Sequence, residues 1–316
     1  MKKKNFRTIF FNENEYTFSY LKSYIKTKKI KSDILVLTIE SINNPFSETI
    51  QLRSNFFLKI FFLTINAKYV YSTSTNLNNS IFLRSKVSKT KYIYLQHSPV
   101  SLSMIYDEKA FINFDAIQAI NKSQYIEVQE INNIFNKKIK PFKSKYRFFT
   151  EQFKYQNQNS VDVLIAPTWH TNFYKLKIHE KLFKIFNEKK ISFEFRPHPM
   201  SIKRKEFQNI DENIRVNQDK LINLKKYKFI ISDWSGIFLE FSIINKSKPI
   251  LVNTDKKILN NNYLKFKNLP IEVETRKIIG VEFEVDNIEG IIKYILNENK
   301  NNSHNEIEKF YQDNFY

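Results

Sequence analysis

Four short segments of this sequence carry side chains that could bind a diphosphate or move a proton. They are Gln96-His97-Ser98-Pro99, Ala166-Pro167-Thr168-Trp169, Arg196-Pro197-His198-Pro199 and Ser232-Asp233-Trp234-Ser235-Gly236. An arginine guanidinium binds phosphate through two parallel hydrogen bonds, and a histidine can accept a proton or donate a hydrogen bond near neutral pH. The four segments therefore indicate a site for a phosphorylated ligand with histidine acid–base chemistry.

The serine- and glycine-containing turn at 232–236 lies between an apolar run, 229–231, and a helical pattern that starts at 237 and ends near 245. Ser and Asp favour helix N-caps, and a glycine lets a ligand approach the backbone. A helix N-terminus also presents unpaired N–H groups and a partial positive charge, which suit a phosphate. The alternative is an ordinary helix cap. The residues expected to hold phosphate here are Ser232, Asp233, Ser235 and Gly236.

The Arg-Pro-His-Pro segment restricts its own backbone, because each proline fixes its φ angle and disfavours helix in the residue before it. Arg196 and His198 are therefore expected to be extended at a strand end and to bind a diphosphate, with a structural turn as the alternative. His97 follows another apolar run in the same way. A lone histidine there is commonly structural, but the two halves of the chain would bring His97 to face the second cluster.

The four segments each follow an apolar run, and such runs alternate with helical patterns along the chain. The expected strands are 8–11, 34–39, 69–71, 92–95, 116–120, 161–166, 191–195, 229–231 and 250–252. This alternation predicts an α/β protein with parallel sheets, whose ligands bind beyond the carboxyl ends of the strands. The pattern weakens between 150 and 160, so we expect domains at 1–150 and 151–316, with the last helix, 306–316, packing back on the first domain.

Composition excludes several enzyme designs. The 316 residues include only three glycines, so neither a Walker loop nor a Gly-x-Gly-x-x-Gly fingerprint is present. No cysteine is present, which removes disulfides and thiolate zinc sites, and no His-x-x-x-His pair indicates a helical zinc site. We therefore expect no metal and no cofactor.

The chain is strongly basic, with 51 Lys and Arg against 32 Asp and Glu and a formal net charge of +19. This predicts attraction to anionic substrates, nucleic acid or an anionic membrane surface, although codon composition also enriches lysine. Segment 56–65 is the most apolar, and it is too short to cross a membrane. A buried helix is expected there, with a membrane-surface helix as the alternative. Asn12 and Glu13 interrupt the apolar run after Met1, so no export is expected.

Taken together, the order and spacing of the four segments resemble the CDP-glycerol glycerophosphotransferase family, whose members build teichoic acids and related phosphopolyol or capsule polymers. The similarity covers about 91–254, and the chain departs from the family pattern at Ser98, His170 and Gly236. The resemblance implies a GT-B architecture: two Rossmann-like domains with parallel sheets facing a central cleft. The donor would bind the second domain and the acceptor largely the first.

The resemblance also implies a reaction. A polyol phosphate, such as glycerol phosphate, would pass from a CDP-activated donor to a hydroxyl of a cell-surface polymer or lipid-linked acceptor, and CMP would leave. His97 would act as the base, and His198, Ser232 and Ser235 would hold the donor pyrophosphate. The full expected site is His97 and His198 as catalytic residues, Arg196, Thr168, Ser232, Asp233, Ser235 and Gly236 on the donor, and Ser98 and Tyr106 on the acceptor side.

Other functions are compatible with the same residues. A GT-B glycosyltransferase using a nucleotide sugar would need the same cleft and phosphate site. A non-enzymatic basic protein could bind nucleic acid or a membrane surface, although no nucleic-acid module is recognisable and no nucleic-acid partner is expected. A catalytically inactive relative could keep only the donor site. The expected location is the cytoplasm, with peripheral attachment to the inner face of the cell membrane.

Overall fold

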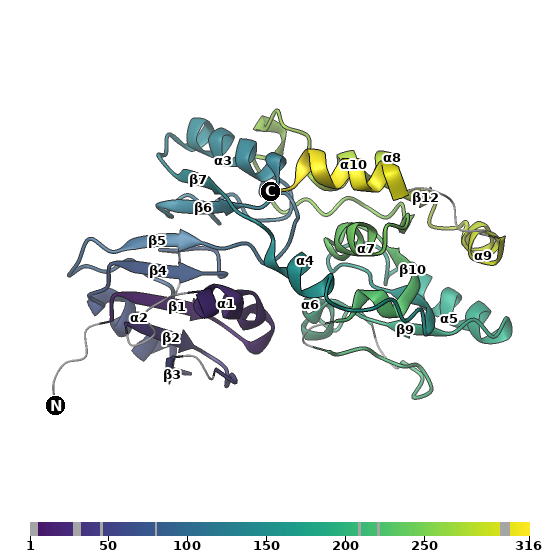
Figure 1. Ribbon diagram of the computed structural model, residues 1–316, viewed down its shortest axis with the longest axis horizontal. Helices are drawn as coiled ribbons and strands as arrows, with labels where there is room; N and C mark the ends of the chain where they lie inside the picture. The colour runs from purple at the N-terminus through teal and green to yellow at the C-terminus, as the bar shows by residue number, and fades with distance from the viewer. Residues whose placement is uncertain are drawn as a thin grey trace.

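Two parallel sheets, arranged in series and covered by helices, make up the computed structural model of the chain (Figure 1). The structure describes residues 6–27, 33–44, 47–79, 81–207, 210–219, 222–297 and 304–316. Residues 1–5, the start of the segment considered for export, lie outside the described residues. Among those described, no helix is both long enough and apolar enough to cross a membrane.

The first domain has a sheet of seven strands in the order β3-β2-β1-β4-β5-β6-β7, and every strand pair is parallel. The strand order reverses between β1 and β4, and such a reversal is where open α/β sheets bind ligands. Its strands are β1 (Thr8–Asn12), β2 (Ile34–Thr38), β3 (Glu48–Gln51), β4 (Tyr69–Ser72), β5 (Lys91–Tyr94), β6 (Ala116–Ala119) and β7 (Lys140–Lys143). Its helices are α1 (Glu15–Thr27), α2 (Asn55–Thr64) and α3 (Lys122–Phe135).

The second domain has a five-stranded parallel sheet in the order β12-β11-β10-β8-β9, with its own reversal between β8 and β10. Its strands are β8 (Val161–Ile165), β9 (Phe193–Phe195), β10 (Tyr227–Ser232), β11 (Ile250–Val252) and β12 (Val281–Phe283). Helix α4 (Arg147–Gln152) leads into it, and its other helices are α5 (Ile178–Glu188), α6 (Pro199–Lys203), α7 (Ile237–Asn245), α8 (Ile271–Ile279), α9 (Ile288–Asn297) and α10 (His304–Asn314). Two single 3₁₀ turns, η1 (Leu224–Lys226) and η2 (Tyr263–Lys265), complete it.

All the expected strands are present, including the edge strand β9, but three other edge strands were not expected. β3, β7 and β12 lie at sheet edges and have mostly exposed or half-buried residues. A strand buried on both faces reads as an apolar run, whereas an edge strand lacks that run. Periodicity alone therefore could not reveal these three.

Helix α7 is more deeply buried than its sequence pattern predicts. The pattern places one apolar face on the sheet, whereas residues 238–244 are all buried in the structure. The opposite face packs against α4, α8 and α10, and Ile307 and Phe310 of α10 belong to the same apolar cluster. α7 is therefore a central helix of the second domain, which fixes the position of its N-terminus.

Two segments of the second half contact the first domain. The crossing segment, residues 253–270, joins β11 to α8, and the backbone N–H of Leu259 within it donates to the carbonyl of Met104 over 2.9 Å. After α10, Phe315 forms a β-bridge with Asn121, and the N–H of Tyr316 donates to the carbonyl of Ile120. Figure 1 shows α10 running back to the first domain beside α3. The two domains are thus connected at several points of the chain.

Candidate active site

A cavity of about 510 Å³ lies between the two domains, and residues at the carboxyl ends of strands of both sheets line it. The first domain contributes Asn14 after β1, Thr75 after β4 and His97 after β5. The second contributes residues after β8, β9 and β10. The reversal points of both sheets therefore open onto one cleft, which is the position expected for a ligand site.

His97 lines the cleft among aromatic rings. Its Nδ1 lies 3.3 Å from the hydroxyl of Tyr94, and the rings of Tyr20 and Tyr106 lie edge-on at 6.2 and 6.5 Å between centroids. Burial lowers the pKa of His97 from its usual 6.5 to about 4. The imidazole is therefore neutral at physiological pH, which is the state that can accept a proton.

His198 also lines the cleft, and its protonation state follows from its role as the N-cap of α6. Its Nδ1 accepts a hydrogen bond from the backbone N–H of Met200 over 3.0 Å. Burial is the largest cause that lowers its pKa to about 3, and the nearby charge of Lys257 adds to the effect. A neutral imidazole that accepts at Nδ1 carries its hydrogen on Nε2, so His198 can donate one hydrogen bond to a ligand.

Arg196 and Thr168 line the cleft from the ends of β9 and β8. The Arg196 guanidinium donates to the side-chain oxygen of Asn217 over 2.8 Å, which orients it. The hydroxyl of Thr168 accepts a hydrogen bond from Nζ of Lys257 over 3.3 Å. Lys257 also lies 4.4 Å from the centre of the Trp169 ring. Arg196 and Lys257 place two cationic side chains on the second-domain side of the cleft, and such groups suit an anionic ligand such as a diphosphate.

Lys257 was not among the expected site residues. It is 4% exposed, lines the cleft and makes no ion pair among the residues that the structure describes. Burial lowers its pKa to about 8, although the carboxylates of Asp233 and Glu272 oppose the shift. The rule that ligands bind beyond strand ends, applied to 250–252, points to this stretch of sequence.

The turn after β10 divides into a buried part and a cleft-facing part. Ser232 and Asp233 are fully buried and do not line the cavity. The Ser232 hydroxyl donates to the carbonyl of Ala166, and the Asp233 carboxylate accepts from the Thr168 N–H at 2.7 Å and the Thr171 hydroxyl at 2.8 Å. The two side chains thus connect β10 to the loop after β8. Ser235 and Gly236, in contrast, line the cleft.

Gly236 is required by a contact between the domains. A Cβ atom at this position would lie 2.4 Å from the Oγ of Ser98 and 2.8 Å from a methyl carbon of Val100. Both neighbours belong to the loop after β5, so the first domain occupies the space beside this glycine. The expectation that the absent side chain leaves room for a ligand therefore needs correction: the room is taken by Ser98, and the ligand-facing space lies beside it.

Glu240 is a second cleft residue that the sequence did not point to. It lies in the first turn of α7 and lines the cavity, and its carboxylate accepts from the Tyr146 hydroxyl over 2.6 Å. The same hydroxyl lies 3.1 Å from the backbone carbonyl of His97. Burial raises the pKa of Glu240 to about 8, so the carboxyl can carry a proton at neutral pH. Tyr146 therefore connects α7 to the loop that carries His97.

Two buried carboxylates from opposite domains bind the same loop beyond His97. Glu272 of α8 accepts from the N–H of Ser101 over 2.8 Å, and Glu127 of α3 accepts from the N–H of Leu102 over 2.8 Å. Glu127 also accepts from the backbone N–H and hydroxyl of Ser103. Burial raises the pKa of Glu127 to about 8 and that of Glu272 to about 7. The loop is thereby fixed to both domains.

Ser98 and Tyr106, the expected acceptor-side residues, both line the cleft. Unexpected polar groups lie at the first reversal point. The side-chain oxygens of Asn12 and Thr73, at the ends of β1 and β4, are buried and have no hydrogen-bond partner among the described residues. Buried polar atoms without partners are rare, which marks this edge of the first sheet as a place for a polar group.

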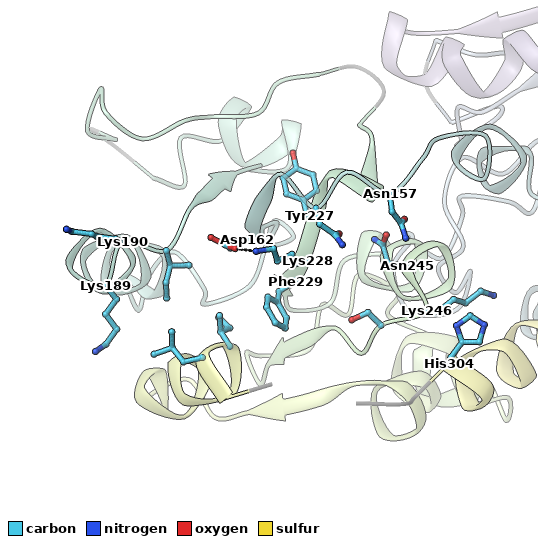
Figure 2. Close-up of a pocket in the computed structure, with 15 residues that line it drawn as sticks. Asn157, Asp162, Lys189, Lys190, Tyr227, Lys228, Phe229, Asn245, Lys246 and His304 are labelled. Atoms are coloured by element: carbon cyan, nitrogen blue, oxygen red, sulfur yellow. Dashed lines mark hydrogen bonds and ion pairs between the residues drawn. The ribbon is translucent and has the colours of Figure 1, made fainter. Parts of the chain in front are cut away.

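A second cavity, of about 820 Å³, lies at the opposite end of the second domain (Figure 2). It is larger than the cleft, but it is lined by the amino ends of β8 and β10, by the residues that follow α5, and by the C-terminal ends of α7 and α9. Two of its cations are already paired, Lys228 with Asp162 and Lys246 with Glu308. Parallel sheets bind ligands at their carboxyl ends, so the interdomain cleft is the candidate active site.

In the part of the chain that the structure describes, no group of three or more His, Cys, Asp or Glu side chains is arranged to hold a metal ion. The cleft residues that can bind an anion or accept a proton are its two histidines, Arg196, Lys257 and those at the N-terminus of α7.

Comparison with known proteins gives the fold. No family model matches the chain, and no curated protein matches it. Among solved structures, UDP-N-acetylglucosamine 2-epimerase from Neisseria meningitidis, bound to UDP-GlcNAc, is similar with a TM-score of 0.57, 12% identity and coverage of 96% of this chain and 98% of that one. The chain has the GT-B fold. This confirms the expected α/β class and two-domain architecture.

Two further structures support the same fold. S. aureus MnaA in a co-structure with UDP matches with a TM-score of 0.56, 10% identity and coverage of 96% and 91%. The 2-epimerase from Rickettsia bellii matches with a TM-score of 0.56, 12% identity and coverage of 98% and 95%. None of the structures described here is a CDP-glycerol glycerophosphotransferase, so that resemblance stands on the four sequence motifs.

Proposed function

We propose that the chain is a transferase that binds a nucleotide-diphosphate-activated donor in the interdomain cleft, and that the donor is a nucleotide sugar. The observation that supports this most is the meeting of His97 of one domain with Arg196, His198 and Lys257 of the other around a single cavity. Two of the solved structures with the same fold contain UDP or UDP-GlcNAc. A donor of this class carries two phosphates, which match the cations.

On the donor side, Arg196 and Lys257 offset the diphosphate charge, and the Nε2–H of His198 donates to a phosphate oxygen. Because its pKa is about 3, His198 acts as a hydrogen-bond donor and not as an acid. The N-terminus of α7, with Gly236 as its N-cap, has no side-chain cap. The N–H of Phe238 donates to the carbonyl of Ser235, so we assign the N–H groups of Gly236 and Ile237 to a phosphate beside Ser98. The buried side chains of Ser232 and Asp233 fix the position of this turn through their hydrogen bonds to the loop after β8.

On the acceptor side, we assign His97 as the general base. The Tyr94 hydroxyl donates to that of Tyr106, so its oxygen can accept from the Nδ1–H of His97, and Nε2 keeps a free lone pair. The acceptor is a hydroxyl of a cell-surface polymer or lipid-linked molecule. Its oxygen bonds to the anomeric carbon, the carbon–oxygen bond to phosphate breaks, the nucleoside diphosphate leaves, and His97 takes the proton.

A CDP-activated polyol is the second candidate donor, favoured by the four motifs shared with the CDP-glycerol glycerophosphotransferase family. In that reaction the acceptor oxygen attacks the β-phosphorus, the bond to the bridging oxygen breaks and CMP leaves. His97 again takes the proton. The same cations would stabilise the negative charge that develops on the diphosphate.

Nucleotide release by the purified protein tests the proposal, with UDP-, GDP- and CMP-sugars, CDP-glycerol and CDP-ribitol offered in turn. We expect a nucleotide sugar to release its nucleotide, and we expect His97→Ala to slow release about 10²- to 10⁴-fold. CMP from a CDP-polyol alone would move the function to phosphopolyol transfer. His304→Ala, at an exposed position outside the cleft, is the matched control. If calorimetry detected binding of none of these donors, the transferase proposal would be wrong.

A further inference from the structure

Helix α2 exposes large apolar side chains to solvent. Phe56, Phe57 and Ile60 are 66%, 58% and 43% exposed, whereas Leu58 and Phe62 on the opposite face are fully buried. A helix that covers one face of a sheet normally presents charged or polar residues outward. α2 is therefore apolar on both faces, although only one face is needed for the core of the first domain.

A neighbouring loop adds another exposed apolar side chain at the C-terminal end of α2. The backbone N–H of Lys86 donates to the carbonyl of Leu63 over 2.9 Å, and the Ser85 hydroxyl donates to the carbonyl of Ile65 over 2.7 Å. These bonds hold the loop against the end of α2, where Val87 is 62% exposed. We call Phe56, Phe57, Ile60 and Val87 together the α2 face.

Exposed basic residues lie on the same segments as the α2 face. Arg53, Lys59, Lys86 and Lys89 are all exposed on the same two segments. Glu48 is the single acidic residue in the sequence between 47 and 91, and the basic residues of that stretch are Arg53, Lys59, Lys68, Arg84, Lys86, Lys89 and Lys91. An apolar centre with a cationic rim suits a surface that is apolar in depth and anionic at its boundary.

We propose that the α2 face docks the first domain onto an anionic lipid bilayer, with the aromatic rings at the headgroup boundary and the lysines on the lipid phosphates. A second copy of the chain fits less well, because a symmetric contact through the same face would place basic rim against basic rim. This proposal concerns a surface outside the cleft and does not rest on the proposed reaction.

Vesicle co-sedimentation tests the proposal, with phosphatidylcholine vesicles compared with vesicles that also contain phosphatidylglycerol. We expect binding to the anionic vesicles and about a tenfold or greater loss in the double variant F56S/F57S, because two aromatic side chains no longer enter the boundary. The double variant K86Q/K89Q should bind anionic vesicles less tightly than the wild type does. The loss should be larger for vesicles that contain more phosphatidylglycerol. Leu264→Ser, at a side chain 91% exposed in the second domain, is the matched apolar control.

An added tryptophan gives an independent readout in a folded protein. Phe57→Trp should shift its fluorescence to shorter wavelength when anionic vesicles are added, and Leu264→Trp should not. The proposal is overturned if the wild-type protein does not sediment with anionic vesicles, or if F56S/F57S binds as tightly as the wild type. A dimer in sedimentation velocity that F56S/F57S separates, without vesicle binding, would assign the α2 face to a second copy instead.

Discussion

His97 and His198 are neutral rings in the cleft because burial removes the water that would stabilise their charged forms. An unperturbed histidine base would make kcat/KM fall as pH drops through 6.5. With a pKa of about 4, His97 stays unprotonated well below that value. We therefore expect kcat/KM for the transfer reaction to be level from about pH 7 to pH 5 and to fall only below it.

The pH profile of kcat/KM, measured with the best donor, checks this expectation, and circular dichroism at each pH ensures that the protein remains folded. A fall in kcat/KM centred near pH 6.5 would mean that the essential base is solvated, and His97 would then not be that base.

Gly236 supports a prediction about the contact between domains. Gly236→Ala places a carbon against Ser98 and Val100, and we expect it to destabilise the protein by about 1–3 kcal/mol and to weaken donor binding. The control is Gly236→Ala combined with Ser98→Ala, which removes the Oγ atom that would lie 2.4 Å from the new Cβ and should recover part of the lost stability. Urea unfolding and donor titration measure the two effects. Equal stability of both variants would show that the loop after β5 can move away from α7.

Individual residues also show how far sequence can predict a site. His97, Arg196, His198 and Thr168 reach the cleft, because the residue after a parallel strand points to that edge of the sheet. Ser232 does not, because its hydroxyl binds the neighbouring strand's end. No local pattern distinguishes these two uses of a polar residue at a strand end.

At the scale of elements, the interior strands and the edge strand β9 were predictable, and the edge strands β3, β7 and β12 were not. β10 has a continuous apolar run because it is covered on both faces, whereas β3 reads Glu-Thr-Ile-Gln and pairs on one side only. The crossing segment 253–270 was missed for a related reason. Apart from the single turn η2 it has no regular structure. Its sequence therefore has no hydrophobic periodicity from which the position of Lys257 in the cleft could be predicted.

Glu272, which binds the loop after β5, makes the stability of the folded protein depend on pH. The pKa of Glu272 in the folded protein, about 7, exceeds its ordinary value of 4.5, so the folded state binds its proton more tightly. Its contribution to stability is therefore full below about pH 4.5 and is lost as pH rises through about 7. We expect Glu272→Gln, which carries no charge, to gain on the order of 2 kcal/mol relative to wild type between pH 5 and pH 8.

Unfolding free energies of both proteins at pH 5 and pH 8 measure this gain. Glu289→Gln, at an exposed carboxylate on α9, should show no such difference. A difference between Glu272→Gln and wild type that stayed constant across this range would mean that Glu272 is already ionised in the folded protein.

At the scale of the whole molecule, the end of the chain holds the two domains together. Phe315 is 8% exposed, bridges to Asn121 and packs edge-on against Phe149 at 5.4 Å. We expect Phe315→Ala to cost about 3 kcal/mol and to increase the radius of gyration in solution scattering, because the bridge to the first domain weakens. Phe153→Ala, at a ring 41% exposed in the same aromatic cluster, should change the scattering little.

The bonds of the His97 loop have a consequence for synthesis. Ser101 is bound by Glu272, which is 171 residues later in the chain, and Met104 is bound by Leu259. Domains generally fold as units while the ribosome is still extending the chain. The first sheet can therefore form early, but the loop that follows His97 gains its last partners only when α8 has left the ribosome. We therefore expect a nascent chain shorter than this to have a folded first domain in which the loop after β5 lacks its bonds to Glu272 and Leu259.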